Sequence, residues 1–213
     1  MTIDKGASMR AAFEAIYAAN AWSGGGSGEG SRLLHNRGYV AFLQDFLARR
    51  RIRSVVDLGC GDWQFSQAVD WAGIDYHGYD LVKPVVEANQ RAFGRAGVSF
   101  HLFDGDFASL PAADLLIAKD VLQHWSQSTI EAFLPHLPRF GASLITNCIN
   151  PAGPTVNQDI SDGAFRPLDL RLPPFGLAAT EVYRFANHRP LWTRPFVRPT
   201  WIKLVLLAEA GRR

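Results

Sequence analysis

The sequence lacks the features that define several large protein classes. Its only two cysteines, Cys60 and Cys148, lie far apart and outside any CxxC spacing, which excludes a disulfide framework and a zinc site of paired thiols. No apolar run approaches the roughly 18–20 residues that cross a bilayer. The N-terminal residues MTIDKGASMR lack the apolar segment of a secretory signal. We therefore expect a soluble, cytoplasmic protein with no membrane partner.

Strong charge of one sign is also missing. The formal net charge is +2 and the sequence pI is 8.7, a weak basis for a nucleic-acid partner. The densest cationic run, residues 48–53, closes a predicted helix, where cations complement the carbonyl end of the helix dipole. With 213 residues, of which 47% are hydrophobic, the chain is expected to form one globular domain.

Strands and helices are predicted to alternate through the middle of the chain. The predicted strands cover residues 54–58, 74–79, 98–103, 114–118 and 143–146, and the predicted helices cover 63–69, 84–93 and a segment with capping-box spacing between Ser128 and Glu131. This helix is expected to end at Pro135 and Pro138. Such alternation indicates an α/β fold with a doubly wound, mostly parallel sheet. Two late strands, 181–185 and 201–208, have no helix between them and predict an antiparallel hairpin.

The N-terminal region is predicted to be helical and to contain a flexible break. One helix is expected to be capped by Ser8 and another to run from Gly38 to Arg50. Between them lies SGGGSGEGS, residues 23–31, which is either a linker or a lid whose Ser31 offers a hydroxyl. We thus expect a helical cap with a glycine-rich loop (1–51), a core (52–147), and an insertion with a hairpin (148–213).

A glycine turn, Asp57-Leu58-Gly59-Cys60-Gly61, follows the first predicted core strand. Glycines at a strand-to-helix turn let the backbone approach a ligand, with amide groups turned toward it. Gln64 stands where a dinucleotide fingerprint needs its third glycine, and Asp62 stands where a phosphate loop needs lysine. The turn therefore suits a nucleoside with a cationic group better than a pyrophosphate.

An acid follows this turn at the distance that a ribose site requires. Asp80 lies 19 residues after Gly61, at the carboxyl end of the second predicted strand, where a carboxylate can accept hydrogen bonds from a ribose diol. Asp57 and Asp62 are placed to provide negative charge near an ammonium or sulfonium group.

The motif VVDLGCG, the acid Asp80 and the later Gly105-Asp106-Phe107 resemble class I S-adenosylmethionine-dependent methyltransferases. The resemblance covers roughly residues 38–147 and implies a seven-stranded Rossmann-like sheet with its last strand antiparallel. It implies S-adenosylmethionine as cofactor, with adenine near Asp106 and Phe107. Spacing alone does not separate Asp104 from Asp106 in that role. The implied cofactor residues are Asp57, Gly59, Cys60, Gly61, Trp63, Asp80, Leu81, Asp106, Phe107 and Lys119.

The acceptor is predicted to bind where the fourth predicted strand ends. The sequence there lacks the Asn/Asp-Pro-Pro-Tyr motif seen in amide and exocyclic-amine methyltransferases, which favours a hydroxyl acceptor. His124 follows Asp120 by four residues, so one helical turn would put an imidazole base beside an orienting carboxylate. The alternative is that His124 binds backbone and Asp120 caps a helix. Cys148 is interpreted as a packed thiol and Cys60 as a small filler.

Polar residues after the fifth predicted strand suggest a pocket for a small polar acceptor such as a sugar. The candidates are Asn147, Asn150, Asn157, Asp159, Asp162 and Arg166, with Phe165 and Phe175 as apolar walls and Ser31 from the glycine-rich loop. No spacing indicates a metal site. The alternatives are a non-catalytic S-adenosylmethionine-binding module, or an RNA methyltransferase that uses Arg184, Arg189, Arg194, Arg198, Trp192 and Trp201. The oligomeric state is not predicted.

Overall fold

The computed structural model describes residues 5–22, 26–190 and 198–211. A seven-stranded sheet forms its centre, with the strand order β3-β2-β1-β4-β5-β7-β6. The strands are β1 Ser54–Leu58, β2 Asp75–Asp80, β3 Val98–Leu102, β4 Ala113–Lys119, β5 Phe140–Ile149, β6 Thr180–Ala186 and β7 Ile202–Glu209. The first five strands are parallel, and β7 is antiparallel to both of its neighbours. The predicted doubly wound sheet with a late antiparallel hairpin is confirmed.

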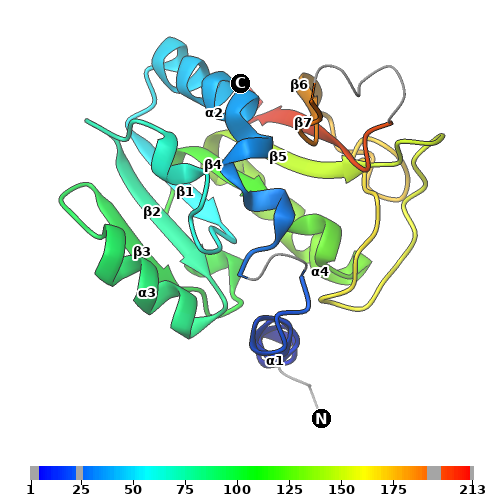
Figure 1. Cartoon of the computed structure of the whole chain (residues 1–213), viewed down its shortest axis with the longest axis horizontal. Coiled ribbons are helices and arrows are strands. Elements are labelled where there is room, and N and C mark those ends of the chain that lie inside the picture. The colour runs from blue at the N-terminus through cyan, green and yellow to red at the C-terminus, as the bar shows by residue number, and fades with distance from the viewer. Residues whose placement is uncertain (1–4, 23–25, 191–197, 212–213) are drawn as a thin grey trace.

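Helices cover both faces of this sheet (Figure 1). They are α1 Lys5–Ala18, α2 Leu33–Arg50, α3 Lys83–Phe93 and α4 Gln127–Phe133. Alternate residues of the central strands β1, β4 and β5 enter two separate hydrophobic clusters. Val56, Leu116 and Ile145 share a cluster with residues of α1 and α4, whereas Val55, Leu115 and Leu144 share one with residues of α2. Strand side chains alternate between the faces, so apolar runs such as Leu115–Ala118 fill both clusters at once.

Two predicted helix starts were wrong. α1 begins at Lys5, so Ser8 lies inside the helix. α2 begins at Leu33, five residues before Gly38. Gly38 lies within α2. A Cβ at this position would stand 2.6 Å from the Tyr183 hydroxyl of β6, so the glycine reflects close packing and not a helix boundary.

Two further helical predictions need correction. Residues 63–69 form turns and one short 3₁₀ helix, Ser66–Ala68, in place of the predicted α-helix. The N-cap of α4 is Ser126, whose hydroxyl accepts a hydrogen bond from the Thr129 amide, and Ser128 lies inside the helix. α4 ends at Phe133, just before Pro135, as expected, and the chain continues as a 3₁₀ segment, Leu134–Arg139, across both prolines.

Candidate active site

One cavity of about 460 Å³ opens at the carboxyl ends of β1, β2 and β4, a size typical of small-molecule sites. At one end lie Asp57 to Gly61 of the glycine turn, together with Asp80 and Leu81. At the other end lie Lys119, Asp120, Gln123, His124, Cys148 and Lys203. Phe13, Tyr17 and Trp22, from α1 and the residues after it, line the same space. The N-terminal helix therefore forms a wall of the site.

Asp80 is held by the backbone of the glycine turn. Its Oδ2 accepts from the Gly61 amide at 3.0 Å, and its Oδ1 accepts from the Val82 amide at 3.0 Å. Burial raises the pKa of the Asp80 carboxyl, and these backbone hydrogen bonds oppose part of that rise. A carboxylate has about four acceptor sites, so part of the acceptor capacity of Asp80 remains for a ligand.

The backbone amides of the glycine turn were predicted to face the ligand, but they are bound to other groups of the protein. The Gly59 and Cys60 amides both donate to the Tyr79 carbonyl, at 2.8 and 3.1 Å, and the Gly61 amide donates to Asp80. The positive φ angles of Gly59 (72°) and Gly61 (55°) and the closeness of Val121 and Ser27 leave no room for side chains at either glycine. These glycines allow loops to pack tightly over the turn.

Asp57 and Asp62 have different environments. Asp57 is buried and lines the cavity; the Tyr76 hydroxyl donates to its Oδ2 at 2.6 Å. Burial raises the pKa of Asp57 to about 6, against the opposing effects of Tyr76 and Lys119. Asp62 does not line the cavity, because its Oδ2 accepts from the Ser27 amide at 3.1 Å. Asp62 therefore fixes the glycine-rich loop.

The glycine-rich loop lies over the cavity where the structure describes it, from residue 26 onward. Ser27, Gly28, Glu29, Gly30 and Ser31 all line the space, as a lid would. The Ser31 hydroxyl donates to the Ser27 carbonyl at 3.1 Å, so it fixes the turn of the loop. Residues 23–25 lie outside the described residues.

Three of the implied cofactor residues do not reach the cavity. Trp63 is buried in the core, where its indole donates to the Tyr76 hydroxyl at 2.9 Å. Phe107 is packed among core aromatics, and Asp106 caps the 3₁₀ helix Phe107–Ser109 through the Ala108 amide. Asp104 also binds neighbouring groups, accepting from the Asp106 amide and the Ser109 hydroxyl. The sequence left open whether Asp104 or Asp106 contacts adenine, and neither residue lines the cavity.

The predicted pairing of Asp120 with His124 was wrong. Asp120 has a left-handed backbone (φ 62°), and its Oδ2 binds two lysines, Lys119 at 2.6 Å and Lys203 on β7. Burial alone would raise the pKa of Asp120, but the two lysines outweigh it and lower the pKa. Burial lowers the pKa of Lys119 to about 8, opposed by Asp120 and reinforced by Lys203.

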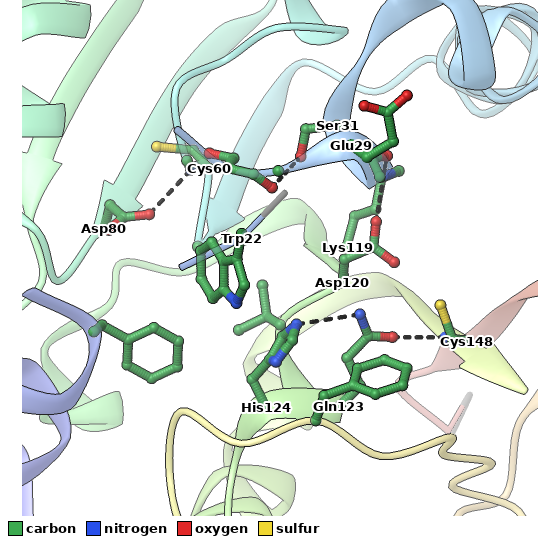
Figure 2. Close-up of a pocket in the computed structure, with 18 of the residues that line it drawn as sticks. Trp22, Glu29, Ser31, Cys60, Asp80, Lys119, Asp120, Gln123, His124 and Cys148 are labelled. Carbon is green, nitrogen blue, oxygen red and sulfur yellow. Dashed lines mark hydrogen bonds and ion pairs between the residues drawn. The ribbon is translucent and has the colours of Figure 1, made fainter. Parts of the chain in front are cut away.

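His124 is fixed by Gln123 and by backbone (Figure 2). The Gln123 Oε1 accepts from the Cys148 amide at 2.7 Å, so the Gln123 Nε2 points at His124 Nε2, 3.3 Å away. The imidazole therefore accepts at Nε2 and donates from Nδ1 to the Ala164 carbonyl at 2.9 Å. Burial lowers the His124 pKa, which favours this neutral form. The alternative in which His124 binds backbone agrees with these contacts.

The polar segment after β5 supports α4 and the surrounding loops. Asp159 and Asp162 accept hydrogen bonds from the Gln127 and Ser126 amides, where carboxylates complement the N-terminus of a helix. Asn147 accepts from the Gln123 amide, and Arg166 donates to the Trp125 carbonyl. Of the residues predicted after β5 to bind the acceptor, Phe165 lines the cavity. The others do not line it: Asn147, Asn150, Asn157, Asp159, Asp162, Arg166 and Phe175.

Both cysteines are buried, and the arginine-rich tail is described only in part. Burial raises the pKa of Cys148 to about 12 and that of Cys60 well above its usual value, as expected for packed thiols. Arg184 pairs with Glu181, and Trp201 lines the cavity beside Lys203. Trp192 and Arg194 lie outside the described residues.

Within the described ranges, no cluster of His, Cys, Asp and Glu is arranged to hold a metal, and no helix could span a membrane.

Comparison with known proteins gives the class of the fold and site. The profile of the O-methyltransferase domain matches residues 11–163. The chain therefore belongs to the O-methyltransferase domain family, which takes its methyl group from S-adenosylmethionine, and S-adenosylmethionine is its cofactor. No curated protein matches the sequence.

Solved structures share the fold at low sequence identity. Magnesium protoporphyrin IX methyltransferase from Synechocystis PCC 6803 with bound SAH has a TM-score of 0.62 and 17% identity, over 96% of this chain and 99% of that one. Human N-acetylserotonin methyltransferase in complex with SAM has a TM-score of 0.54 and 19% identity, over 94% of this chain and 59% of that one. TehB from Haemophilus influenzae has a TM-score of 0.56 and 15% identity, over 82% of this chain and 62% of that one. These similarities show the fold.

Proposed function

We propose that the chain transfers a methyl group from S-adenosylmethionine to an oxygen of a small acceptor bound in the same cavity. The observation that carries this proposal is the continuity of the cavity. It joins the glycine turn and Asp80 at one end to Lys119, Gln123 and His124 at the other. A donor and an acceptor can thus be bound side by side, which removes much of the entropic cost of their encounter.

The residues at the first end fit the cofactor. Asp80 retains acceptor capacity for a ribose diol. Asp57 provides a carboxylate for the positively charged part, and Leu81 and Phe103 offer apolar surface. S-adenosylmethionine supplies an electrophilic methyl group when bound. The chain must therefore align the acceptor oxygen and keep water away from it.

Aromatic rings form part of the wall at the second end. Trp22 and His124 lie side by side with ring centroids 5.3 Å apart (Figure 2). The ring centroid of Phe165 lies 5.7 Å from that of His124. The sugar predicted as acceptor was inferred from polar residues that do not line the cavity. An acceptor with a flat or apolar body fits these walls better.

Methyl-labelled S-adenosylmethionine tests this function directly. The purified full chain, mixed with a fractionated small-molecule extract, is expected to label a low-molecular-weight product whose methyl group is bonded to oxygen, as read by mass spectrometry and NMR. A label on nitrogen, carbon or RNA would contradict the proposed reaction. Cofactor binding without label in any fraction would instead support a non-catalytic binding module.

A further inference from the structure

Two of the four lysines in the sequence converge at the acceptor end of the cavity. The Lys119 side chain is 3% exposed and the Lys203 side chain is 2% exposed. They come from β4 and β7, and both bind the same carboxylate oxygen of Asp120. Two buried ammonium groups therefore share one carboxylate, so this cluster carries an excess positive charge.

Neighbouring acids do not neutralise that excess. Glu29, which also lines the cavity, is paired with Arg32 at 3.0 Å and with His35 at 2.8 Å. Asp57 also interacts electrostatically with Lys119, but it accepts its hydrogen bond from Tyr76 and belongs to the cofactor end, where the bound cofactor brings its own positive charge. An unbalanced buried charge costs several kcal/mol. The cluster would therefore be stabilised by an anion.

The lysines also keep hydrogen-bonding capacity. Both donate to the Gly30 carbonyl, Lys203 at 3.0 Å and Lys119 at 3.4 Å. Each lysine therefore has two acceptors among the described residues, the Gly30 carbonyl and the Asp120 carboxylate. An ammonium group has three N–H donors. Aromatic rings complete the surroundings. The Phe65 ring centroid lies 4.7 Å from the Lys119 Nζ, and the Trp201 ring centroid lies 4.4 Å from the Lys203 Nζ. One N–H on each lysine remains for a ligand.

Anchoring of the glycine-rich loop alone would not need both lysines. The Gly30 backbone approaches Lys203 so closely that a Cβ there would stand 2.9 Å from Nζ. One ammonium is enough to bind this carbonyl and to neutralise Asp120. A second buried lysine adds a desolvation cost without a partner of its own.

We propose that Lys119 and Lys203 bind an anionic oxygen of the acceptor, so the acceptor is an organic acid. This inference rests on the proposed function. Methyl transfer to an oxygen that is already ionised forms the O–C bond from a lone pair and breaks the S–C bond toward sulfur. The carboxylate becomes a neutral methyl ester, the sulfonium becomes a neutral thioether, and no proton is released. The fixed, neutral His124 is consistent with a site that needs no base.

Benzoate and benzamide test this proposal as isosteric probes that differ in charge. With S-adenosylhomocysteine present, benzoate is expected to bind the full chain at least about tenfold more tightly than benzamide, since hydrogen bonds to a charged group are the stronger. Lys203→Met and Lys119→Met should each remove this preference and leave benzamide binding unchanged. Lys83→Met, on the exposed face of α3, is the matched control and should retain it.

A second readout separates anion binding from loss of structure. Because the chain has four lysines, lysine labelled with ¹³C at Cε gives four NMR signals, and benzoate should shift those of Lys119 and Lys203. Benzoate that binds no better than benzamide, or a preference that survives both lysine substitutions, overturns the proposal. If S-adenosylhomocysteine itself does not bind the folded chain, the proposed function fails instead.

Discussion

The two ends of the cavity are built in different ways. The proposed cofactor end comes from residues 57–61 and 80–81, on two adjacent parallel strands joined by one short crossover. The acceptor end combines Gly30, Lys119, Asp120 and Lys203, which meet only when the glycine-rich loop closes over β4 and when β7 pairs beside β5. The first end is local in sequence and the second is not. The predictions below test whether the two ends act separately.

The largest effect is expected from Asp120→Asn at the acceptor end. This change leaves two buried lysines without their shared carboxylate, which should cost about 3–5 kcal/mol and lower the melting temperature by about 10 °C. Asp45→Asn is the control, since Asp45 forms an exposed pair with Arg49 worth about 1 kcal/mol at most. Equal melting temperatures for the two variants would show that the lysine cluster is not a buried charge network.

Asp80→Ala should have the next largest effect, at the other end. The cofactor loses its ribose acceptor, and the Gly61 and Val82 amides lose theirs, so S-adenosylhomocysteine should bind about 100-fold more weakly by calorimetry. Asp75→Ala, at the exposed start of the same strand, should leave the affinity unchanged. A ribose site elsewhere is indicated if the two variants bind alike.

Cofactor affinity should depend on pH through Asp57. Its carboxyl, with a pKa of about 6, is mostly protonated at pH 5 and ionised at pH 7, so S-adenosylmethionine should bind up to about tenfold more tightly at pH 7. The raised pKa also means that the contribution of Asp57 to stability is present below about pH 4 and is lost as the pH rises through about 6. Asp57→Asn should flatten both profiles. If the affinity of the Asp57→Asn variant for S-adenosylmethionine changes with pH as in the unmodified chain, a group other than Asp57 causes the pH dependence.

The smallest effect is expected from His124→Phe. A phenyl ring can keep the contacts with Trp22 and Phe165, so turnover should fall by less than about fivefold, well below the 10²–10⁴-fold contribution of a general base. The measurement is the initial rate of methyl transfer at saturating cofactor. A loss of about 100-fold or more, with cofactor affinity retained, would establish His124 as the base.

The same contrast explains how much could be predicted from sequence. Glycines, an acid and strand order predicted which residues meet at the proposed cofactor end, because residues at the carboxyl ends of adjacent parallel strands meet at one edge. Helical spacing placed Asp120 beside His124, but the left-handed backbone at Asp120 turns its carboxylate to Lys203, 83 residues away in sequence. Asp159 and Asp162 looked like ligand groups because the sequence alone cannot show the helix N-terminus that they cap.

Several residues of the site were missed. Phe13, Tyr17 and Trp22 line the cavity from α1 and the residues after it, which had been assigned only to a cap. Lys203 left a usable signal, since a lysine within the apolar strand IKLVLLAE needs a buried partner. Lys119, at the end of ADLLIAK, carries the same signal, but it had been predicted only as a cofactor residue.

Calorimetric titration of S-adenosylmethionine into three folded proteins tests the two-ended cavity most directly. The unmodified chain and Lys203→Met should bind one equivalent with affinities within about twofold of each other, whereas Asp80→Ala should bind about 100-fold more weakly. If Lys203→Met loses affinity as strongly as Asp80→Ala, or if neither variant changes it, cofactor and acceptor do not occupy separate ends of this cavity.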